Sequence, residues 1–365
     1  MVSFIPSDEQ QQLIDSIRKF ATNDMQPAAH DADEHGSIPA AVLNKGWQIG
    51  LVPTAIPEEL GGLGELSALN GVLAAEELAF GDLSAALAIL SPALFATPVT
   101  LYGTAEQREV WLPGFLEAKP PKTTAALLEP GIFFDPHHLK TTAVEADGGY
   151  VLNGHKAVVP LADDADVLLV YAHDESSGST EGFLVNKGTA GLSIADGEKL
   201  MGLRALPTFR VSLDNVKVDA PCRLGGAVGS DFNGLVNRMR VASAALAVGV
   251  GRAAFEYARD YAKQRQAFGA PIAQKQAIAF MLAEMAIEVD AMRLQTWEAA
   301  WTLDQGEDAT KKAYLAKTYA DKAVMQVADS GVQVLGGYGF IREYPAERWL
   351  RNARGFAALE GIAIV

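Results

Sequence analysis

The spacing of hydrophobic positions changes twice along this chain. In roughly the first 120 residues apolar positions recur at helical spacing, beginning with Leu13, Ile17 and Phe20 after a capping box of Ser7 and Gln10. From about residue 123 to 226 apolar and polar positions alternate, which is typical of strands with one buried face. After Gly234 the helical spacing returns and continues. The pattern predicts helices, then a sheet, then helices.

In the first part, the Ala- and Leu-rich segment 68–88 contains no proline. We expect it to form one buried helix around the acidic pair Glu76 and Glu77, weakened only by its glycines. The preceding segment 50–64 is rich in Pro and Gly and is predicted to be a loop.

The middle part contains a short-hairpin signal at Asp147-Gly148, because both residues tolerate a positive φ. The strand-like run 141–146 lies before this turn. In the run 209–214 apolar and polar residues alternate, so one face of this strand is expected to be buried. We predict an antiparallel β domain.

The last part contains long helical segments without proline, at 236–264, 276–303 and about 311–335. Each has one apolar face, which favours an antiparallel bundle. The stripe on the second segment comprises Ile278, Met281, Leu282, Met285, Val289 and Met292.

Composition narrows the class of protein. The 365 residues carry a formal net charge of −15, and a surface of that sign repels nucleic acid and anionic lipid. The single cysteine, Cys222, excludes an intramolecular disulfide and indicates a reducing compartment. We find no apolar run near the length that spans a bilayer and no signal peptide, so we expect a soluble cytoplasmic protein without nucleic-acid or membrane partners.

Several common catalytic motifs are missing from the sequence. It has no P-loop, no HExxH, no GxSxG, and no GxGxxG between a strand and a helix. The pair His137-His138 could bind a metal, but after a proline in a loop we interpret it as an exposed pair, and we expect no metal site.

Two candidate ligand-binding segments lie in the helical C-terminal third. Arg265 and Phe268 close one helix before Gln276 opens the next, and an Arg at this place suits a phosphate or simply caps the helix. Gln333 precedes the consecutive glycines Gly336 and Gly337, which allow close backbone approach to a ligand or simply end a helix.

The candidate general base is Glu360. It is the only side-chain carboxylate after Glu347, and its neighbours include Phe356, Leu359 and Ile362. Apolar surroundings raise the pKa of a carboxyl group toward the range in which it works as a base, whereas a lone Glu near a chain end is often simply solvated.

Taken together, these segments resemble the signature of the acyl-CoA dehydrogenase family. The order is RxxFG, Gln, QxxGGxG, and then RxxR with Glu-Gly nine residues after Arg351. Further similar blocks extend the resemblance over nearly the whole chain: 57–64, 76–82, 129–131, 150–156 and 197–204.

The resemblance implies the family's α+β fold: an N-terminal helical domain (1–122), a middle β domain (123–230) and a C-terminal four-helix bundle (231–365). It also implies a homotetramer or heterotetramer that binds FAD and an acyl-CoA substrate. The chemistry would be an α,β-dehydrogenation in lipid metabolism, with electron-transfer flavoprotein as acceptor.

The resemblance also implies roles for individual residues. Glu360 would be the catalytic base, with Arg240 beside the thioester. Met239 stands where some members carry the base instead. The cofactor-binding residues would lie on the adenosine and pyrophosphate side of FAD: Arg265, Phe268, Gln276, Gln333, Gly336 and Gly337.

The sequence departs from the family where the flavin ring should bind. Leu128, Pro160 and Ile362 replace hydroxyl residues, and Val158 and the pair Phe133-Phe134 replace other side chains of the family pattern. Each missing donor to a buried polar ring edge costs about 1 to 3 kcal/mol. We therefore expect this chain alone to hold FAD weakly or not at all. Two alternatives remain open: a half-site partner subunit of a heteromeric dehydrogenase, or a flavin-free acyl-CoA binding protein.

The chain also ends soon after Glu360, before a helix that usually follows in the family.

Overall fold

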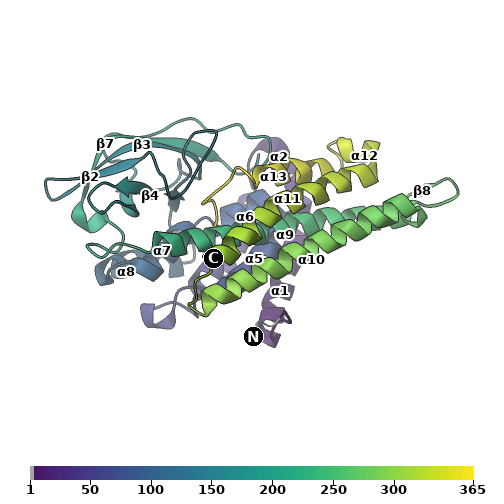
Figure 1. Cartoon of the computed structure of the whole chain (residues 1–365), viewed down its shortest axis with the longest axis horizontal. Coiled ribbons are helices and arrows are strands. Elements are labelled where there is room, and N and C mark those ends of the chain that lie inside the picture. The colour runs from purple at the N-terminus through teal and green to yellow at the C-terminus, as the bar shows by residue number, and fades with distance from the viewer. Residues whose placement is uncertain (1–3) are drawn as a thin grey trace.

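The computed structural model describes residues 4–365, which form an N-terminal group of helices, a sheet and a bundle of long helices (Figure 1). This order and the family fold predicted from the sequence are confirmed. The first helix begins with the predicted capping box at Ser7 and Gln10. The N-terminal helices are α1 (Asp8–Phe20), a π-helical turn (Ala21–Met25), α2 (Gln26–His35), α3 (Ala40–Gln48), α4 (Leu51–Thr54), α5 (Ala68–Gly81), α6 (Leu83–Leu90), α7 (Ala93–Tyr102) and α8 (Ala105–Trp111).

The prediction of one unbroken helix over 68–88 is wrong. Helix α5 ends at Gly81, and Asp82 has extended backbone angles. The Asp82 carboxylate accepts a hydrogen bond from the Ala85 N–H at 2.9 Å, so it caps the start of α6. An aspartate competes with the helix backbone for hydrogen bonds and favours such a cap.

The middle β domain is confirmed, with a turn at Asp147-Gly148 where both residues have positive φ. Its sheet order is β1-β4-β2-β3-β7-β6, with β5 on β4. The strands are β1 (Thr123–Ala126), β2 (Thr142–Ala146), β3 (Gly149–Pro160), β4 (Val167–Asp174), β5 (Ser179–Asn186), β6 (Leu192–Ile194) and β7 (Thr208–Asp219).

We had predicted an antiparallel sheet, but the sheet also contains parallel pairings. Strand β4 pairs in parallel with both β1 and β2. Strand β3 lies between β4 and each of these partners in the sequence, which provides the length of chain that a parallel pairing requires. The remaining pairings of the large sheet are antiparallel.

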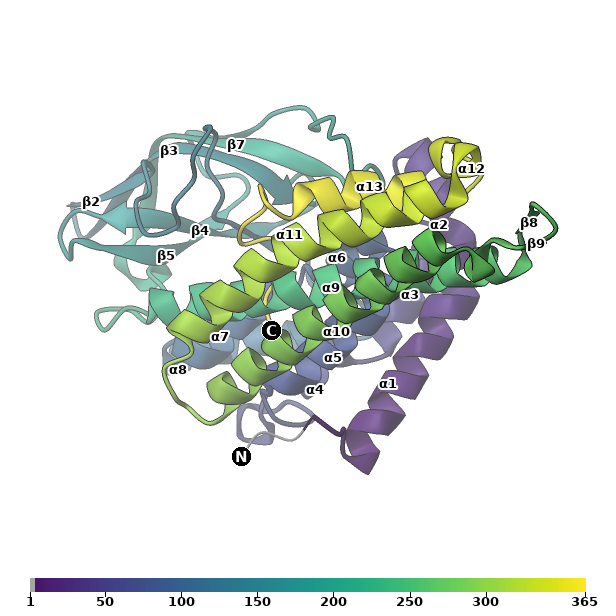
Figure 2. The same ribbon diagram turned by 45° about the vertical axis from the view of Figure 1, so that its right-hand side comes forward.

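Three long helices form the C-terminal bundle and run side by side (Figure 2). The predicted apolar faces are buried, as at Met285, Val289 and Met292 on the second of them. The helices are α9 (Phe232–Gln264), α10 (Gln276–Asp304) and α11 (Thr310–Leu335), followed by α12 (Gly337–Phe340) and α13 (Ala346–Gly355). A small hairpin of β8 (Gln266–Ala267) and β9 (Ala270–Pro271) joins α9 to α10.

One segment of the described chain, Leu83–Tyr102, is long and apolar enough to cross a membrane by length and composition, with a mean hydropathy of 1.6. This corrects our expectation that no apolar run reaches that length. The segment comprises α6 and α7, and its apolar window is entirely buried inside the protein. Its hydrophobicity is therefore that of a core element.

Candidate active site

Glu360 lies in the loop after α13, next to the buried Leu359. Its side chain is 20% exposed. Gly361 follows with φ +70°, and a Cβ at this position would lie 2.6 Å from Leu127 Cδ2, so the close approach of the loop to the β domain requires a glycine. The apolar sequence neighbour Ile362 is buried as expected, but the carboxylate itself also has the charged Lys317 close by.

The groups around Glu360 shift the pKa of its carboxyl in opposite directions. Burial raises the pKa of the Glu360 carboxyl above its usual range, while Lys317 and Arg240 act to lower it. Lys317 Nζ lies 3.8 Å from Glu360 Oε1. The carboxylates of Asp321 and Asp135 add to the rise. The result is a carboxyl group shifted toward the pKa of a general base.

Arg240 lies on α9, with its guanidinium over the Tyr314 ring at 5.4 Å from the ring centre. Its Nε is buried and has no hydrogen-bond partner among residues 4–365. A buried donor without a partner is costly, so this atom is suited to bind an acceptor on a ligand. The structure thus brings Arg240 and Glu360 into one electrostatic neighbourhood, as predicted for a thioester site.

The loop between β1 and β2 brings further titratable groups to this site. Asp135 accepts hydrogen bonds from the His137 backbone N–H at 3.0 Å and pairs with the His138 ring at 2.7 Å. Burial lowers the pKa of His137, and Arg240 adds to the effect. Within the described chain no cluster of three or more His, Cys, Asp or Glu side chains could hold a metal ion.

The sequence alone did not reveal three charged groups that act on Glu360: Lys317, Asp321 and Asp135. Lys317 and Asp321 lie within a helical pattern that predicts only a core face and a solvated face. No motif in the sequence connects them to the loop after α13. They could have been found only by knowing how α11 packs against α13.

The candidate cofactor residues lie together at the other end of the bundle. Arg265 ends α9 and stacks over the Tyr338 ring, with 5.6 Å to its centre. Gly336 has φ +60° and ψ −132°, a conformation essentially restricted to glycine. A Cβ at Gly336 or at Gly337 would meet nothing within 4 Å, so the backbone here is open to a ligand.

The remaining candidate residues at this end are also accessible. Gln276 and Gln333 are exposed, and Phe268 is 95% exposed with a positive φ. This end of the bundle therefore offers three kinds of hydrogen-bond donor: an exposed guanidinium, the backbone N–H groups of two glycines with open space beside them, and two exposed side-chain amides. Donors of these kinds hold a pyrophosphate and an adenosine.

The two groups of residues are far apart in one chain. Arg240 and Arg265 both belong to the α9 region, and at about 1.5 Å per residue they are separated by about 37 Å. In Figure 1 the β domain and the β8 hairpin lie at opposite ends of the molecule. One FAD cannot contact the Arg265 end and the β domain of the same chain, so a shared cofactor would have to lie between two chains.

The predicted flavin-ring positions come together between β1, β3 and the Glu360 loop. The Ala157 N–H donates to the Leu128 carbonyl at 2.9 Å. The Val158 N–H is already taken by Glu198 at 2.7 Å, and Val158 has a positive φ of 53°, which is strained for a β-branched residue. The side chains of Leu128 and Ile362 are buried.

The residues therefore fit one half of FAD better than the other. The donors around Arg265 suit the adenosine and pyrophosphate, whereas Leu128, Pro160 and Ile362 offer no side-chain donor to a flavin ring. Phe133, which we expected to add bulk at the ring, is 94% exposed and fills no part of this chain's own core.

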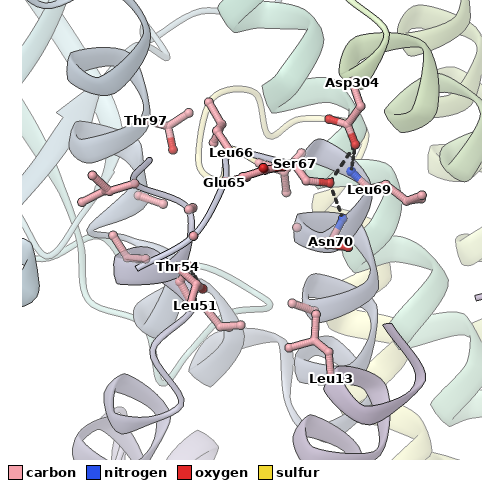
Figure 3. Close-up of a pocket in the computed structure, with 18 of the residues that line it drawn as sticks. Leu13, Leu51, Thr54, Glu65, Leu66, Ser67, Leu69, Asn70, Thr97 and Asp304 are labelled. Atoms are coloured by element: carbon pink, nitrogen blue, oxygen red, sulfur yellow. Dashed lines mark hydrogen bonds between the residues drawn. The ribbon is translucent and has the colours of Figure 1, made fainter. Parts of the chain in front are cut away.

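A separate cavity of about 640 Å³ lies between α5, α7, the segment 51–67 that begins with α4, and the C-terminal residues Ile364 and Val365 (Figure 3). At its rim Asp304 accepts hydrogen bonds from Ser67 Oγ at 2.7 Å and from the Leu69 N–H at 3.0 Å. Glu360 is not among its lining residues.

Three family models match nearly the whole chain. They are the acyl-CoA dehydrogenase N-terminal domain at residues 7–119, the middle domain at 124–216 and the C-terminal domain at 231–363. The chain belongs to the acyl-CoA dehydrogenase family.

Individual relatives are similar over almost their full length. A caffeyl-CoA reductase-Etf complex subunit, CarC, of Acetobacterium woodii is 35% identical, covering 98% of this chain and 96% of the relative. The butyryl-CoA dehydrogenase of Megasphaera elsdenii has a TM-score of 0.88 at 30% identity, covering 97% of this chain and 95% of the other. A structure described as the FAD complex of PigA has a TM-score of 0.88 at 25% identity, covering 97% and 94%.

Proposed function

We propose that this protein is an oxidoreductase that dehydrogenates an acyl-CoA thioester between its α and β carbons. The observation that carries the proposal is Glu360, a mostly buried carboxylate with a raised pKa on which the charge of Arg240 acts. The Nε of Arg240 is itself buried and has no hydrogen-bond partner among residues 4–365. Family membership supports the same chemistry, because its relatives include a butyryl-CoA dehydrogenase and a caffeyl-CoA reductase.

In this proposal the residues of the chain bind the thioester and move the proton. Arg240 donates to an acceptor on the thioester, which favours negative charge at the α carbon as the proton leaves. Glu360 accepts that α proton and must be ionised to do so. FAD, when bound, supplies the acceptor for the β hydride.

The test of the base is Glu360→Gln, assayed for dehydrogenation over a panel of acyl-CoA thioesters. Loss of a general base should lower the rate by about 100-fold or more. Glu343→Gln is the matched control, because Glu343 is exposed and close in sequence. Dehydrogenation that survives in Glu360→Gln at more than a tenth of the original rate would remove Glu360 as the base.

A second candidate function is a half-site partner subunit of a heteromeric dehydrogenase. The missing side-chain donors at Leu128, Pro160 and Ile362 favour it, together with the intact donors around Arg265. The flavin content of the purified chain separates the two. One FAD per chain with activity supports the ordinary enzyme, whereas flavin only after co-purification with a second family member supports the partner subunit.

A chain that binds acyl-CoA but never flavin would instead be an acyl-CoA binding protein.

The partners follow from the same proposal. Large apolar side chains are exposed along one face of α10, at Phe280, Ile287 and Leu294, and such a stripe supports an oligomer, which we propose to be a tetramer.

The name of the Acetobacterium woodii relative places that protein in an Etf complex, which supports electron-transfer flavoprotein as the acceptor here. The single unpaired Cys222 supports a cytoplasmic location. Native mass spectrometry of the purified protein measures the oligomer directly.

A further inference from the structure

The loop that carries Glu360 is attached to helix α11 by one buried lysine. Lys317 is 6% exposed, and its Nζ donates to the Phe356 carbonyl at 3.1 Å. Phe356 ends α13 and begins the short segment that leads to Glu360. The same Nζ lies 3.8 Å from Glu360 Oε1.

Lys317 is shared between two carboxylates. It donates to Asp321 Oδ2 at 2.8 Å, one helical turn further along α11. Asp321 is itself half-buried, and its second oxygen, Oδ1, is buried without a hydrogen-bond partner in the described chain. Glu360, Lys317 and Asp321 thus form a line of alternating charge in which the lysine stands between two acids.

We infer that Lys317 and Asp321 are positioning residues that jointly set the protonation of Glu360 and fix its loop. Lys317 favours the ionised form of Glu360 through its charge and holds the backbone through Phe356. Asp321 weakens that effect by pairing with the same ammonium group. The inference rests on the proposed role of Glu360 and deepens it.

Other charged groups face Glu360 from the remaining elements. Arg240 approaches from α9 and Asp135 from the loop between β1 and β2, and His137 lies beside Arg240 on that loop. Within residues 4–365 none of these three side chains hydrogen-bonds to the backbone of the Glu360 loop, whereas Lys317 has both the charge and the hydrogen bond to the Phe356 carbonyl. A change at Lys317 should therefore move both the titration and the position of Glu360.

The test uses two substitutions with opposite expected effects on the full-length protein. Lys317→Met removes the positive charge, so the Glu360 carboxyl should stay protonated to a pH about one unit higher or more. Asp321→Asn frees Lys317 from its second partner, so the carboxyl should ionise at a lower pH. Lys322→Met and Asp329→Asn are matched controls, because both residues are exposed on the same helix.

The measurement is the infrared C=O band of the protonated Glu360 carboxyl as a function of pH, assigned by its absence in Glu360→Gln. This readout requires neither flavin nor turnover. Shifts of opposite sign in the two variants, with unchanged controls, support the inference. Shifts of the same sign, or no shift, would overturn it.

Two further outcomes are distinguishable. If Lys317→Met does not fold, Asp321→Asn alone decides, because a downward shift supports the inference and any other result contradicts it. If the shifts occur but Glu360→Gln keeps its activity, the positioning holds and the proposed function fails. If the inference and the proposed function are both right, the dehydrogenation rate of each variant should fall on acidification around the same pH as the midpoint of its infrared titration.

Discussion

At the scale of single residues, a cluster of buried, oppositely charged side chains lies between α5 and α9. Glu77 is 3% exposed and accepts from Arg252 at 2.6 Å and from Arg18 at 2.7 Å. Burial alone would raise the pKa of Glu77, but the hydrogen bonds from the two arginines outweigh it and hold that pKa below its usual range. Breaking such a pair leaves an uncompensated buried charge.

We predict that stability falls on acidification through this carboxylate. The pKa of Glu77 is lower in the folded state than its ordinary value of 4.5, so its contribution is complete above about pH 4.5 and is lost as the pH falls through the folded value. Glu77→Gln should cost about 3 kcal/mol at neutral pH. It should also flatten the dependence of stability on pH below 4.5.

Urea unfolding of both proteins between neutral and acidic pH measures this effect. Glu284→Gln, on the exposed surface of α10, is the control and should behave like the original protein. A Glu77→Gln variant with the original acid dependence would show that the pairs with Arg252 and Arg18 do not control it.

At the scale of secondary structure, the approach of α5 to α9 depends on a single glycine. A Cβ at Gly249 would lie 2.3 Å from the Glu76 carbonyl oxygen and 2.8 Å from Ala79 Cβ. The nearest obstacle is backbone, which cannot rotate away. This close crossing also brings Arg252, one turn along α9, to the carboxylates of α5.

Gly249→Ala should therefore destabilise the protein. The gain in helix propensity is about 1 kcal/mol, but overpacking against a fixed backbone costs about 1 to 3 kcal/mol or more. The control is Gly251→Ala, because the nearest atom to its Cβ would be the flexible end of Met292 at 3.0 Å, and the next, Val289 Cγ2 at 3.6 Å, is at ordinary contact distance. We expect thermal unfolding to place Gly249→Ala below the original protein and Gly251→Ala close to it. Equal stability of the two variants would contradict this account of the crossing.

At the scale of the whole molecule, the two groups of candidate flavin-site residues lie far apart in one chain. The Arg265 end and the β domain lie at opposite ends of α9 (Figure 1). A cofactor that contacts both types of residue must therefore lie between chains. If one FAD contacts both groups of residues, each chain contributes to a neighbour's site.

If the chain forms an active homo-oligomer, two inactive variants should complement each other. Glu360→Gln disables the base of its own site, and Arg265→Ala disables the phosphate donor given to a neighbour. Co-expression then assembles some sites with both residues intact, and random pairing restores about one quarter of the activity. The two proteins mixed after purification, without subunit exchange, are the control and should remain inactive.

Absence of any regained activity on co-expression, with mixed oligomers confirmed by mass spectrometry, would show that Arg265 does not serve the neighbouring chain. Retention of full activity in Arg265→Ala alone would also contradict its role as a phosphate donor.

The amino-acid sequence by itself determined the order of helices, sheet and bundle. Helical or alternating spacing shows which face of an element is buried. It does so without any knowledge of the element that covers that face. The turn at Asp147-Gly148 and the buried apolar neighbours of Glu360 were predictable for the same reason, since backbone conformation and neighbouring residue types lie close in sequence.

Only the tertiary structure decided which elements pack or pair with one another. Periodicity cannot distinguish a helix that continues through Asp82 from one that is capped there, because apolar residues occur on both sides of the cap that Asp82 forms with the Ala85 N–H. Apolar and polar residues alternate in the same way in parallel and antiparallel strands, so the sequence could not reveal the parallel pairing of β4 with β1 and β2. The approach of Lys317 to Glu360 follows from how α11 packs against α13, and no spacing along the chain contains that distance.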